Sequence, residues 1–320
     1  MRIIIVTTSY PSVDDDASGH FVQTEARALV REGHEVVVVT PGIPGRSNEQ
    51  GVVVERLPHG EAFGAPGALY RISEKPQRLR GAWQFVREAR AFLRREPCDR
   101  VVAHWILPSG WPIGLATRAE LEVVAHGSDV RLLRLIPRPL RGAVLRSLLN
   151  RGARFRFVSS ELRNLVADAG AAELYAQARV ALSPIDVSAA PDREQARAER
   201  RIDPRDRLIV IVGRLIVSKR TGTALAAVSL LPRARVVVVG SGPERAALEQ
   251  RFPEAQFVGH LPRTQALGWI AAADLLVSAS RDEGAPTVVR EARALGIPVV
   301  STSSSDLHEW ARSDRDLFVV

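Results

Sequence analysis

The chain has 320 residues, of which 46% are hydrophobic and 25% are charged, close to the average for a soluble globular protein. These proportions exclude a disordered tail, a collagen-like fibre and a membrane bundle. The length favours two domains over one. The single cysteine, Cys98, excludes an intramolecular disulfide and a zinc site built on several cysteines.

The net charge is +8, and only two of the 44 basic residues, Lys75 and Lys219, are lysines. Residues 131–156 contain eight arginines and no acidic residue, so this segment is a candidate surface for an anionic partner. The apolar run at residues 3–6 is much shorter than a signal-peptide core, about 7–15 residues. No run approaches the roughly 18 apolar residues of a spanning helix. The sequence therefore predicts a cytoplasmic protein.

Short apolar runs rich in β-branched residues alternate with segments of helical periodicity, which is typical of parallel sheets covered on both faces. In the first part, this pattern predicts strands at 3–6, 35–40, 52–57, 100–104, 123–126, 155–158 and 180–182, and helices at 20–31, 79–95 and 137–151. In the second part, it predicts strands at 208–212, 236–239, 256–258, 275–277, 297–300 and 316–320, and helices at 221–231, 243–251, 263–272 and 286–295.

The two series are separated by residues 184–206, which are rich in Pro, Ala, Arg and Asp and contain no long apolar run. The predicted fold class is α/β, with two tandem Rossmann-like, doubly wound domains facing a cleft. The first domain is expected at 1–185, a linker at 186–206 and the second domain at 207–320. Ligands of such sheets bind at the carboxyl ends of the strands.

Two familiar nucleotide and metal motifs are weak or absent. No glycine-rich turn follows the first strand, and Arg245 stands where Gly240-Ser241-Gly242 would need a third glycine, which argues against a nicotinamide or flavin enzyme. Asp14 and Asp16 have the Asp-x-Asp spacing of a divalent-metal site beside a sugar nucleotide. Their Pro-, Ser- and Asp-rich surroundings favour a solvated loop instead.

Glu283 and Glu291 have the same spacing as Glu88 and Glu96, but a different context. Glu88 and Glu96 lie on one predicted helix and are interpreted as part of a solvated face. Glu283 follows a predicted strand and precedes residues 284–287, where Pro286 suits the first turn of a helix. Free amides at a helix N-terminus bind anions, and carboxylates beside them can accept hydrogen bonds from sugar hydroxyls. The segment therefore indicates a nucleotide-sugar site.

Arg214 and Lys219 support this interpretation, because they follow the first strand of the second domain and could hold a diphosphate. Together these motifs resemble the donor domain of glycosyltransferase family 4, a family of retaining GT-B enzymes. The resemblance covers residues 207–303 and rests on Gly213-Arg214-Leu215 with Lys219, Val239-Gly240-Ser241-Gly242-Pro243, Gly259, Ala273-Asp274, Ser278-Ala279-Ser280, Glu283-Gly284-x-Pro286 with Glu291, and Ala294-x-Gly296-x-Pro298. Looser similarities in the first half are the Gly19 loop, Gly33-His34-Glu35-Val36, His104-Trp105 and His126-Gly127-Ser128-Asp129.

The resemblance implies that the first domain faces the acceptor and the second binds the donor. In the second domain, Arg214 and Lys219 would hold the diphosphate, Glu291 the ribose and Glu283 the donor sugar, while Gly259 would face the base. The sugar and phosphate would be lined by residues Gly284, Ala285, Pro286 and Thr287. His126 would reach the reacting sugar and, with Glu283, act in catalysis. Gly19 and His104 would lie on the acceptor side.

Two departures from the family pattern are visible. Arg220 stands where the family usually has glycine, which is expected to reshape the phosphate loop. Family members also typically continue beyond the point that corresponds to Val320, with a last helix that crosses back to the first domain. The donor domain is therefore expected to be incomplete, with poor domain closure.

The predicted function is a retaining transfer of a sugar from a nucleotide-diphosphate donor to an acceptor hydroxyl, in polysaccharide, glycolipid or glycoconjugate synthesis. No cofactor or metal is expected, because the two cations and the helix N-terminus would neutralise the diphosphate. Residues Arg131–Arg156 are a candidate contact with an anionic membrane at its inner face, with Arg141, Arg146 and Arg151 pointing away from an apolar face that contains Leu140.

Three other interpretations stay open. These are another GT-B sugar-nucleotide enzyme such as an epimerase, a protein that binds nucleotide sugars without transfer, and an RNA-binding protein. The last lacks any motif in which aromatic residues alternate with basic ones.

Overall fold

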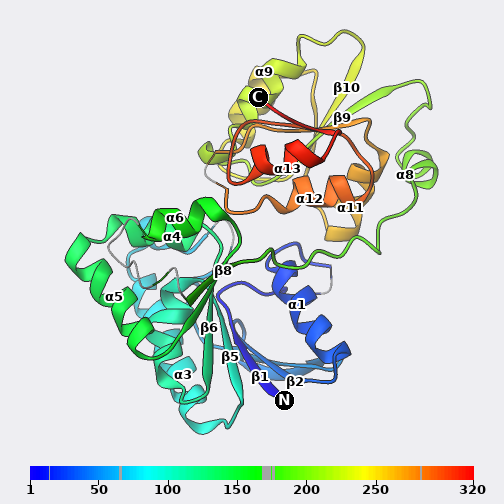
Figure 1. Ribbon diagram of the computed structural model, residues 1–320. Helices are drawn as coiled ribbons and strands as arrows, with labels where there is room; N and C mark the ends of the chain where they lie inside the picture. Colours follow the sequence, from blue (N-terminus) through cyan, green and yellow to red (C-terminus); the bar gives the residue numbers. More distant parts are fainter. Residues whose placement is uncertain (14, 65–66, 168–173, 175–176, 282) are drawn as a thin grey trace. The chain divides into compact units, whose positions relative to one another are not determined.

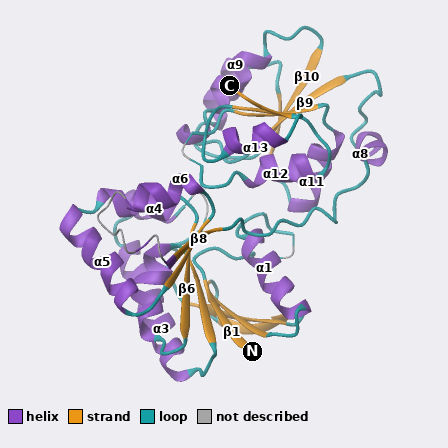
Figure 2. Ribbon diagram, viewed as in Figure 1, coloured by secondary structure: helices purple, strands orange, loops and turns teal. Residues whose placement is uncertain are grey.

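The computed structural model describes residues 1–13, 15–64, 67–167, 174, 177–281 and 283–320. The chain divides into two compact units, Met1–Pro184 and Ile185–Val320 (Figure 1). Each unit is built on its own predominantly parallel sheet with helices around it (Figure 2). The predicted fold class, two Rossmann-like α/β domains, is confirmed.

The first unit contains an eight-stranded sheet with the order β3-β4-β2-β1-β5-β6-β7-β8. Its strands are β1 (Arg2–Val6), β2 (Glu35–Pro41), β3 (Gly45–Glu49), β4 (Val52–Leu57), β5 (Arg100–His104), β6 (Glu120–Ala125), β7 (Arg154–Phe157) and β8 (Ala178–Val180). The sheet is parallel except for β3, which pairs antiparallel with β4. The central strands β1 and β2 are almost completely buried, which explains their continuous runs of Ile and Val.

Helices in the described part of the first unit are α1 (His20–Arg31), α2 (Ala68–Glu74), α3 (Arg78–Arg95), α4 (Ser128–Leu135), α5 (Arg138–Asn150) and α6 (Ser160–Ala167). The predicted boundaries of α1 and α3 agree with the structure to within one residue. The predictions lacked β3, α2, α4 and α6. β3 escaped prediction because its sequence, Gly-Arg-Ser-Asn-Glu, is polar throughout and exposed over most of its length.

The second unit contains a six-stranded, fully parallel sheet with the order β11-β10-β9-β12-β13-β14. Its strands are β9 (Arg207–Val212), β10 (Ala234–Val239), β11 (Gln256–Gly259), β12 (Leu275–Ser278), β13 (Val299–Ser301) and β14 (Leu317–Val319). Its helices are α8 (Arg193–Glu199), α9 (Thr221–Val228), α10 (Arg245–Arg251), α11 (Arg263–Ala272), α12 (Thr287–Ala294) and α13 (Leu307–Ser313).

Residues 186–206, for which a linker is predicted, contain α8 and belong to the second unit. Arg197 of α8 donates hydrogen bonds to the carbonyl of Ala272 at 3.0 Å and to the carboxylate of Asp274 at 3.2 Å. Asp274 also accepts a 2.7 Å hydrogen bond from the backbone amide of Leu208, at the start of β9. The side chain of Arg197 thus ties this segment to the second sheet.

The arginine-rich segment 131–156 differs from its predicted arrangement. Val144, Leu145, Leu148 and Leu149 of α5 are buried as expected, but Leu140 is 61% exposed and Arg141 is buried. Arg141 therefore lies on the buried side of α5 and Leu140 on its exposed side, the reverse of the prediction. Arg151 donates to the carbonyls of Thr117 and Ala119. None of the helices in the described ranges has the length and apolar character required to cross a membrane.

Candidate functional site

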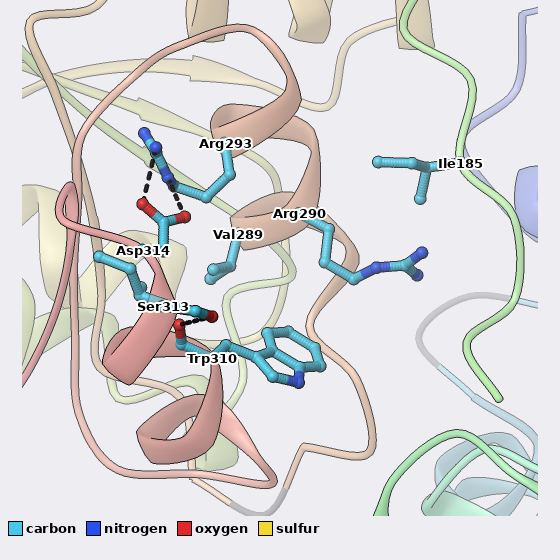
Figure 3. A pocket seen from close by; sticks show the side chains of 8 residues that line it. Ile185, Val289, Arg290, Arg293, Trp310, Ser313 and Asp314 are labelled. Carbon is cyan, nitrogen blue, oxygen red and sulfur yellow. Dashed lines mark hydrogen bonds and ion pairs between the residues drawn. The ribbon is translucent and has the colours of Figure 1, made fainter. Parts of the chain in front are cut away.

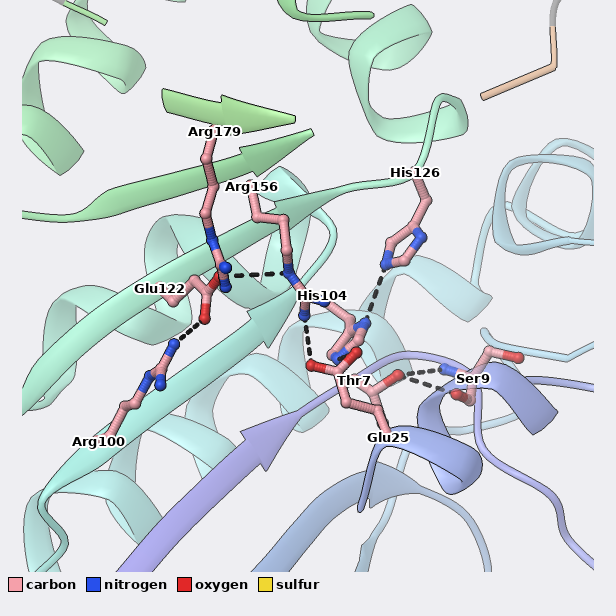
Figure 4. A network of polar contacts seen from close by, with 9 residues as sticks. All are labelled: Thr7, Ser9, Glu25, Arg100, His104, Glu122, His126, Arg156 and Arg179. Atoms are coloured by element: carbon pink, nitrogen blue, oxygen red, sulfur yellow. Dashed lines mark hydrogen bonds and ion pairs between the residues drawn. The ribbon is translucent and has the colours of Figure 1, made fainter. Parts of the chain in front are cut away.

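Two histidines are in direct contact at the carboxyl edge of the first sheet. His104 ends β5, and His126 follows the neighbouring parallel strand β6. Nδ1 of His104 lies 2.9 Å from Nε2 of His126, and the two rings stack with their centroids 5.1 Å apart. The histidine predicted to be catalytic therefore has a second imidazole against it (Figure 4).

Aromatic rings enclose His126 on other sides. The ring centroids of Phe21, on α1, and Trp105 lie 4.8 Å and 5.0 Å from that of His126. His126 is half-buried, whereas His104, predicted on the acceptor side, is completely buried. Burial lowers the pKa of both imidazoles well below its usual value, and the nearby charge of Arg156 adds to this effect; His104 also lowers the pKa of His126. Both rings are therefore neutral near pH 7.

An ion network centred on the buried residues Arg156 and Glu122 lies behind the two histidines. Arg156 of β7 forms ion pairs with Glu25 of α1 and with Glu122 of β6. Glu122 also pairs with Arg100 of β5 and Arg179 of β8, so its carboxylate joins three strands besides its own (Figure 4). The arginine charges lower the pKa of Glu122 even though burial, the largest single effect, raises it.

Asp129 shapes the turn that presents His126. Its buried carboxylate accepts backbone hydrogen bonds from Ile106 at 2.8 Å, Gly127 at 2.9 Å and His126 at 3.1 Å. Burial, the largest effect, raises the pKa of this carboxyl although the backbone amides oppose the shift. The motif His126-Gly127-Ser128-Asp129 therefore works as a unit in which Asp129 holds the loop.

Gly19 lies immediately before α1 and adopts a left-handed conformation, with φ of +70°. A Cβ atom at this position would lie 2.3 Å from the carbonyl oxygen of Ser9. Only glycine permits this close approach of the loop after β1 to the start of α1.

The carboxyl edge of the second sheet brings together Lys219 and Glu283, 64 residues apart in sequence. The ammonium group of Lys219, after β9, forms an ion pair with the carboxylate of Glu283, after β12; both side chains are about one-fifth exposed, at 21% and 19%. The backbone amide of Arg281 donates to the carbonyl of Ser218 at 2.8 Å, which ties the two loops together. Arg214, the other predicted diphosphate ligand, is exposed.

Two glycine-containing loops pack tightly beside this pair. A Cβ on Gly240, which follows β10, would lie 1.9 Å from the carbonyl oxygen of Gly213, which follows β9. The backbone amide of Gly240 donates to the carbonyl of Gly259, at the end of β11, at 2.8 Å. Arg220 has φ of +49°, a conformation that favours glycine. Arg220 thus adopts a backbone conformation that a glycine would adopt without strain.

Helix α12 follows Pro286, and its second turn carries Glu291. Glu291 is 6% exposed and is paired with Arg263 of α11, which also donates to the backbone carbonyl of Asp186. The hydroxyl of Ser305 donates to the carbonyl of Gly284. Residues 284–287 therefore form a braced turn that opens α12 close in sequence to Glu283.

The residues predicted to bind the donor thus gather at one edge of the second sheet. Sequence reasoning missed Arg263, since its partner Glu291 is 28 residues away and an arginine at the start of a helix carries no special signal. It also missed Glu25, which the helical pattern of α1 does not distinguish from a surface glutamate. Arg156 was noted only as part of the arginine-rich segment.

A separate hollow of about 350 Å³ in the second unit lies between α12 and α13 (Figure 3). It is lined in part by Val289, Trp310 and Leu317, and by an ion pair in which Arg293 holds the carboxylate of Asp314 at 2.7 Å and 2.8 Å. None of the predicted site residues lines it. Within the ranges that the structure describes, no three His, Cys, Asp or Glu side chains are grouped to hold a metal ion. Asp14 of the Asp-x-Asp motif lies outside those ranges.

Both units match families of known proteins. Residues 17–184 match the family model described as glycosyl transferase 4-like domain, and residues 206–320 match that of glycosyl transferases group 1. The teichuronic acid biosynthesis glycosyltransferase TuaC, as it is named in Bacillus subtilis (strain 168), is 30% identical over 332 residues, which cover 94% of this chain and 81% of TuaC.

Solved structures of low sequence identity share the fold. Sucrose-phosphate synthase from Thermosynechococcus elongatus is similar with a TM-score of 0.80 and 19% identity, covering 100% of this chain and 86% of that one. Anabaena HepE, solved in complex with UDP and glucose, is similar with a TM-score of 0.70 and 16% identity, covering 100% of this chain and 85% of its own.

Proposed function

The chain belongs to glycosyltransferase family 4, a family of GT-B enzymes, and we propose that it moves a sugar from a nucleotide-diphosphate donor to an acceptor hydroxyl with retention of configuration. The observation that carries the donor proposal is the ion pair of Lys219 and Glu283, which lies at the carboxyl edge of the second sheet beside the turn that opens α12. The complex of HepE with UDP and glucose supports the same class of donor.

The proposed donor contacts use charges that are already in place. Lys219 and Arg214 bind the diphosphate, helped by the amides of residues 285–287 at the start of α12. Gly259 lies beside the base, Glu291 accepts hydrogen bonds from the ribose and Glu283 from the donor sugar. Lys219 is already held by Glu283 in the free protein. Its side chain therefore loses little conformational freedom when a diphosphate replaces part of that contact.

Catalysis in this proposal stabilises the departing diphosphate. The acceptor attacks the face from which the diphosphate leaves, and the leaving phosphate takes the acceptor proton. Lys219, Arg214 and the start of α12 stabilise the developing negative charge, and no metal takes part. His126 binds the reacting sugar from the first unit, with Gly19 on the acceptor side.

A thermal-shift screen with UDP-, GDP- and ADP-sugars, with and without a chelator, tests the donor. A ligand at 100 times its dissociation constant stabilises the protein by about 2.7 kcal/mol. Addition of a sugar acceptor should then release nucleotide, and NMR of the product should show the donor's anomeric configuration. Absence of any shift with all three donors would contradict a nucleotide-sugar site. Binding without nucleotide release would favour the alternative of a binding protein, and donor isomerisation that of an epimerase.

The name of TuaC supports an acceptor in polysaccharide or glycoconjugate synthesis, and a surface of the first unit favours a lipid-linked one. Leu135 and Leu140, 79% and 61% exposed, flank the turn between α4 and α5. Arg131, Arg134 and Arg138 around them are exposed, and no acidic residue lies in the segment. Two exposed apolar side chains among cations suit an anionic membrane surface, where each basic residue contributes about 1 kcal/mol.

Co-sedimentation with phosphatidylglycerol vesicles tests this contact. Binding should be present at low salt and weaker at high salt, because salt screens exposed charges. Changing Arg131, Arg134 and Arg138 to glutamine should abolish it. The matched control is the same change at three other exposed arginines of the first unit, Arg94, Arg95 and Arg118. An equal loss of vesicle binding in both triple variants would show a response to net charge alone. It would contradict a membrane role for this surface.

A further inference from the structure

Two buried polar atoms in the first unit face each other without a hydrogen bond. Oε2 of Glu25 and Nε2 of His104 are both buried, make no hydrogen bond among the described residues, and lie 3.8 Å apart. Buried polar atoms are almost always paired. Each atom is therefore available as a partner for the other, at a separation just beyond hydrogen-bond length, and their pairing would require a proton on one of the two atoms.

Glu25 determines the direction of this pairing. Its other oxygen, Oε1, forms the ion pair with the guanidinium of Arg156, and both oxygens of a carboxylate in such a pair only accept hydrogen bonds. The proton between Glu25 and His104 must therefore lie on Nε2 of His104. A neutral imidazole carries one proton, which leaves Nδ1 of His104 as an acceptor.

The same logic extends to His126. Because Nδ1 of His104 accepts, Nε2 of His126 must donate across their 2.9 Å contact. Nδ1 of His126 then carries no proton. This atom makes no hydrogen bond within the described part of the chain, and it is not among the buried atoms that lack one, so it is accessible from outside the unit.

We propose that Glu25 and His104 are positioning residues that fix the tautomer of His126, so that Nδ1 of His126 accepts a hydrogen bond from a substrate hydroxyl. This inference rests on the proposed function, in which His126 contacts the reacting sugar. The proton arrangement runs from Glu25 on α1 through His104 of β5 to His126 in the loop after β6 (Figure 4).

The surroundings of His126 keep this arrangement in place. In the described part of the chain, the His126 ring contacts His104 from β5, whose own neighbours include Glu25 from α1, and the charge of Arg156 from β7 acts on both rings. Asp129 from α4 binds the backbone amide of His126. Phe21, which packs on the His126 ring, is four residues before Glu25 on α1 and therefore lies on the same face of that helix. One helix thus supplies both the carboxylate that orients His104 and a ring that holds His126.

Nitrogen NMR of protein labelled with ¹⁵N-histidine reads the tautomers directly, without any substrate. In the native protein, His126 and His104 should both be protonated at Nε2 and not at Nδ1. Glu25→Gln should reverse both. Arg156 needs an acceptor and will hold the amide oxygen of the new side chain, which turns the NH₂ group toward Nε2 of His104. His104 then donates from Nδ1, and His126 carries its proton on Nδ1.

Two controls make this test specific. Glu32→Gln, at the exposed end of α1, should leave both tautomers unchanged. His104→Asn can keep an acceptor near the position of Nδ1, whereas His104→Leu cannot. With an active donor–acceptor pair, kcat should fall about tenfold or more in Glu25→Gln and His104→Leu, with less change in donor KM, and should recover in large part in His104→Asn.

A native His126 protonated at Nδ1, or unchanged tautomers in Glu25→Gln, would overturn the proposal. The proposal would also be overturned if the native tautomers are as expected but kcat is unchanged in a folded His104→Leu protein. In that case the contacts of Glu25, His104 and His126 would have no effect on the reaction. If no donor is turned over at all, the proposed function fails. The NMR result still decides whether Glu25 and His104 fix the tautomer of His126.

Discussion

Replacing Glu291 with alanine distinguishes a donor ligand from a structural ion-pair partner. The side chain of Glu291 is 8% exposed and is paired with Arg263. Glu88 has the same spacing to a second glutamate, but its side chain is 34% exposed and forms an ion pair with the neighbouring Arg87. A hydrogen bond between ribose hydroxyls and a buried carboxylate contributes about 1.5–3 kcal/mol. Glu291→Ala should therefore weaken donor binding by roughly 10- to 150-fold.

The measurement is calorimetric titration with the donor identified by thermal shift. Glu88→Ala serves as the control and should leave donor affinity within about twofold of native, because Glu88 is not among the residues proposed to contact the donor. The protein should remain folded, since an exposed ion pair contributes only about 0–1 kcal/mol to stability. Arg263→Ala separates the two roles of Glu291. If Glu291 contacts the donor, Arg263→Ala should reduce affinity much less than Glu291→Ala. Unchanged donor affinity in a folded Glu291→Ala protein would refute the reasoning.

Three further predictions concern the second unit and are measured as its free energy of unfolding. Arg220→Gly should raise this energy by about 1 kcal/mol, because the left-handed conformation is strained for arginine and not for glycine; a decrease would mean that the Arg220 side chain makes stabilising contacts. Gly240→Ala should lower the free energy of unfolding by about 3 kcal/mol, since the new Cβ would lie 1.9 Å from the carbonyl oxygen of Gly213. The control is Gly296→Ala, where φ is +74° and no atom lies within 4 Å of the new Cβ. It should lower the free energy of unfolding by only about 1 kcal/mol. Hydrogen bonds from Arg293 lower the pKa of Asp314, so this pair stabilises the fold above the unfolded-state pKa, near 3.8, and its contribution is lost as the pH falls through the lower folded value. Asp314→Asn should therefore reduce the loss of unfolding free energy on acidification. An unchanged loss would assign the acid dependence to other carboxylates.

The buried strands were predictable because their sequences allow little else. Runs such as Ile3–Val6 and Val36–Val39 are continuously apolar and β-branched, which only a strand covered on both faces explains. The hairpin of β3 and β4 was not predictable in this way. Its turn at Gln50 and Gly51, with φ of +55° and +86°, lacks the usual Asn-Gly signal, and β3 is polar.

The proposed donor-binding edge was predictable as a set of positions, but the contacts within it were not. The order of strand, loop and helix places Lys219 and Glu283 at the same edge, but their ion pair depends on the loops that the backbone contact between Arg281 and Ser218 ties together. Likewise, His126 has a recognisable motif, while Glu25 and Arg156 gain their significance only when α1 and β7 pack around His104. Such contacts are tertiary and leave no periodic pattern in the sequence.

Two of the edge strands, β3 in the first sheet and β14 in the second, differ in their tendency to promote self-association. An edge strand exposes unpaired amides and carbonyls, and polar or charged side chains there hinder pairing with a second molecule. β3, at the edge of the first sheet, is exposed and polar and therefore resists such pairing. β14, at the edge of the second sheet, presents Phe318, which is 53% exposed, and is followed by Val320, which is 76% exposed. In concentrated solutions of this chain, strand addition should therefore occur at β14 more readily than at β3.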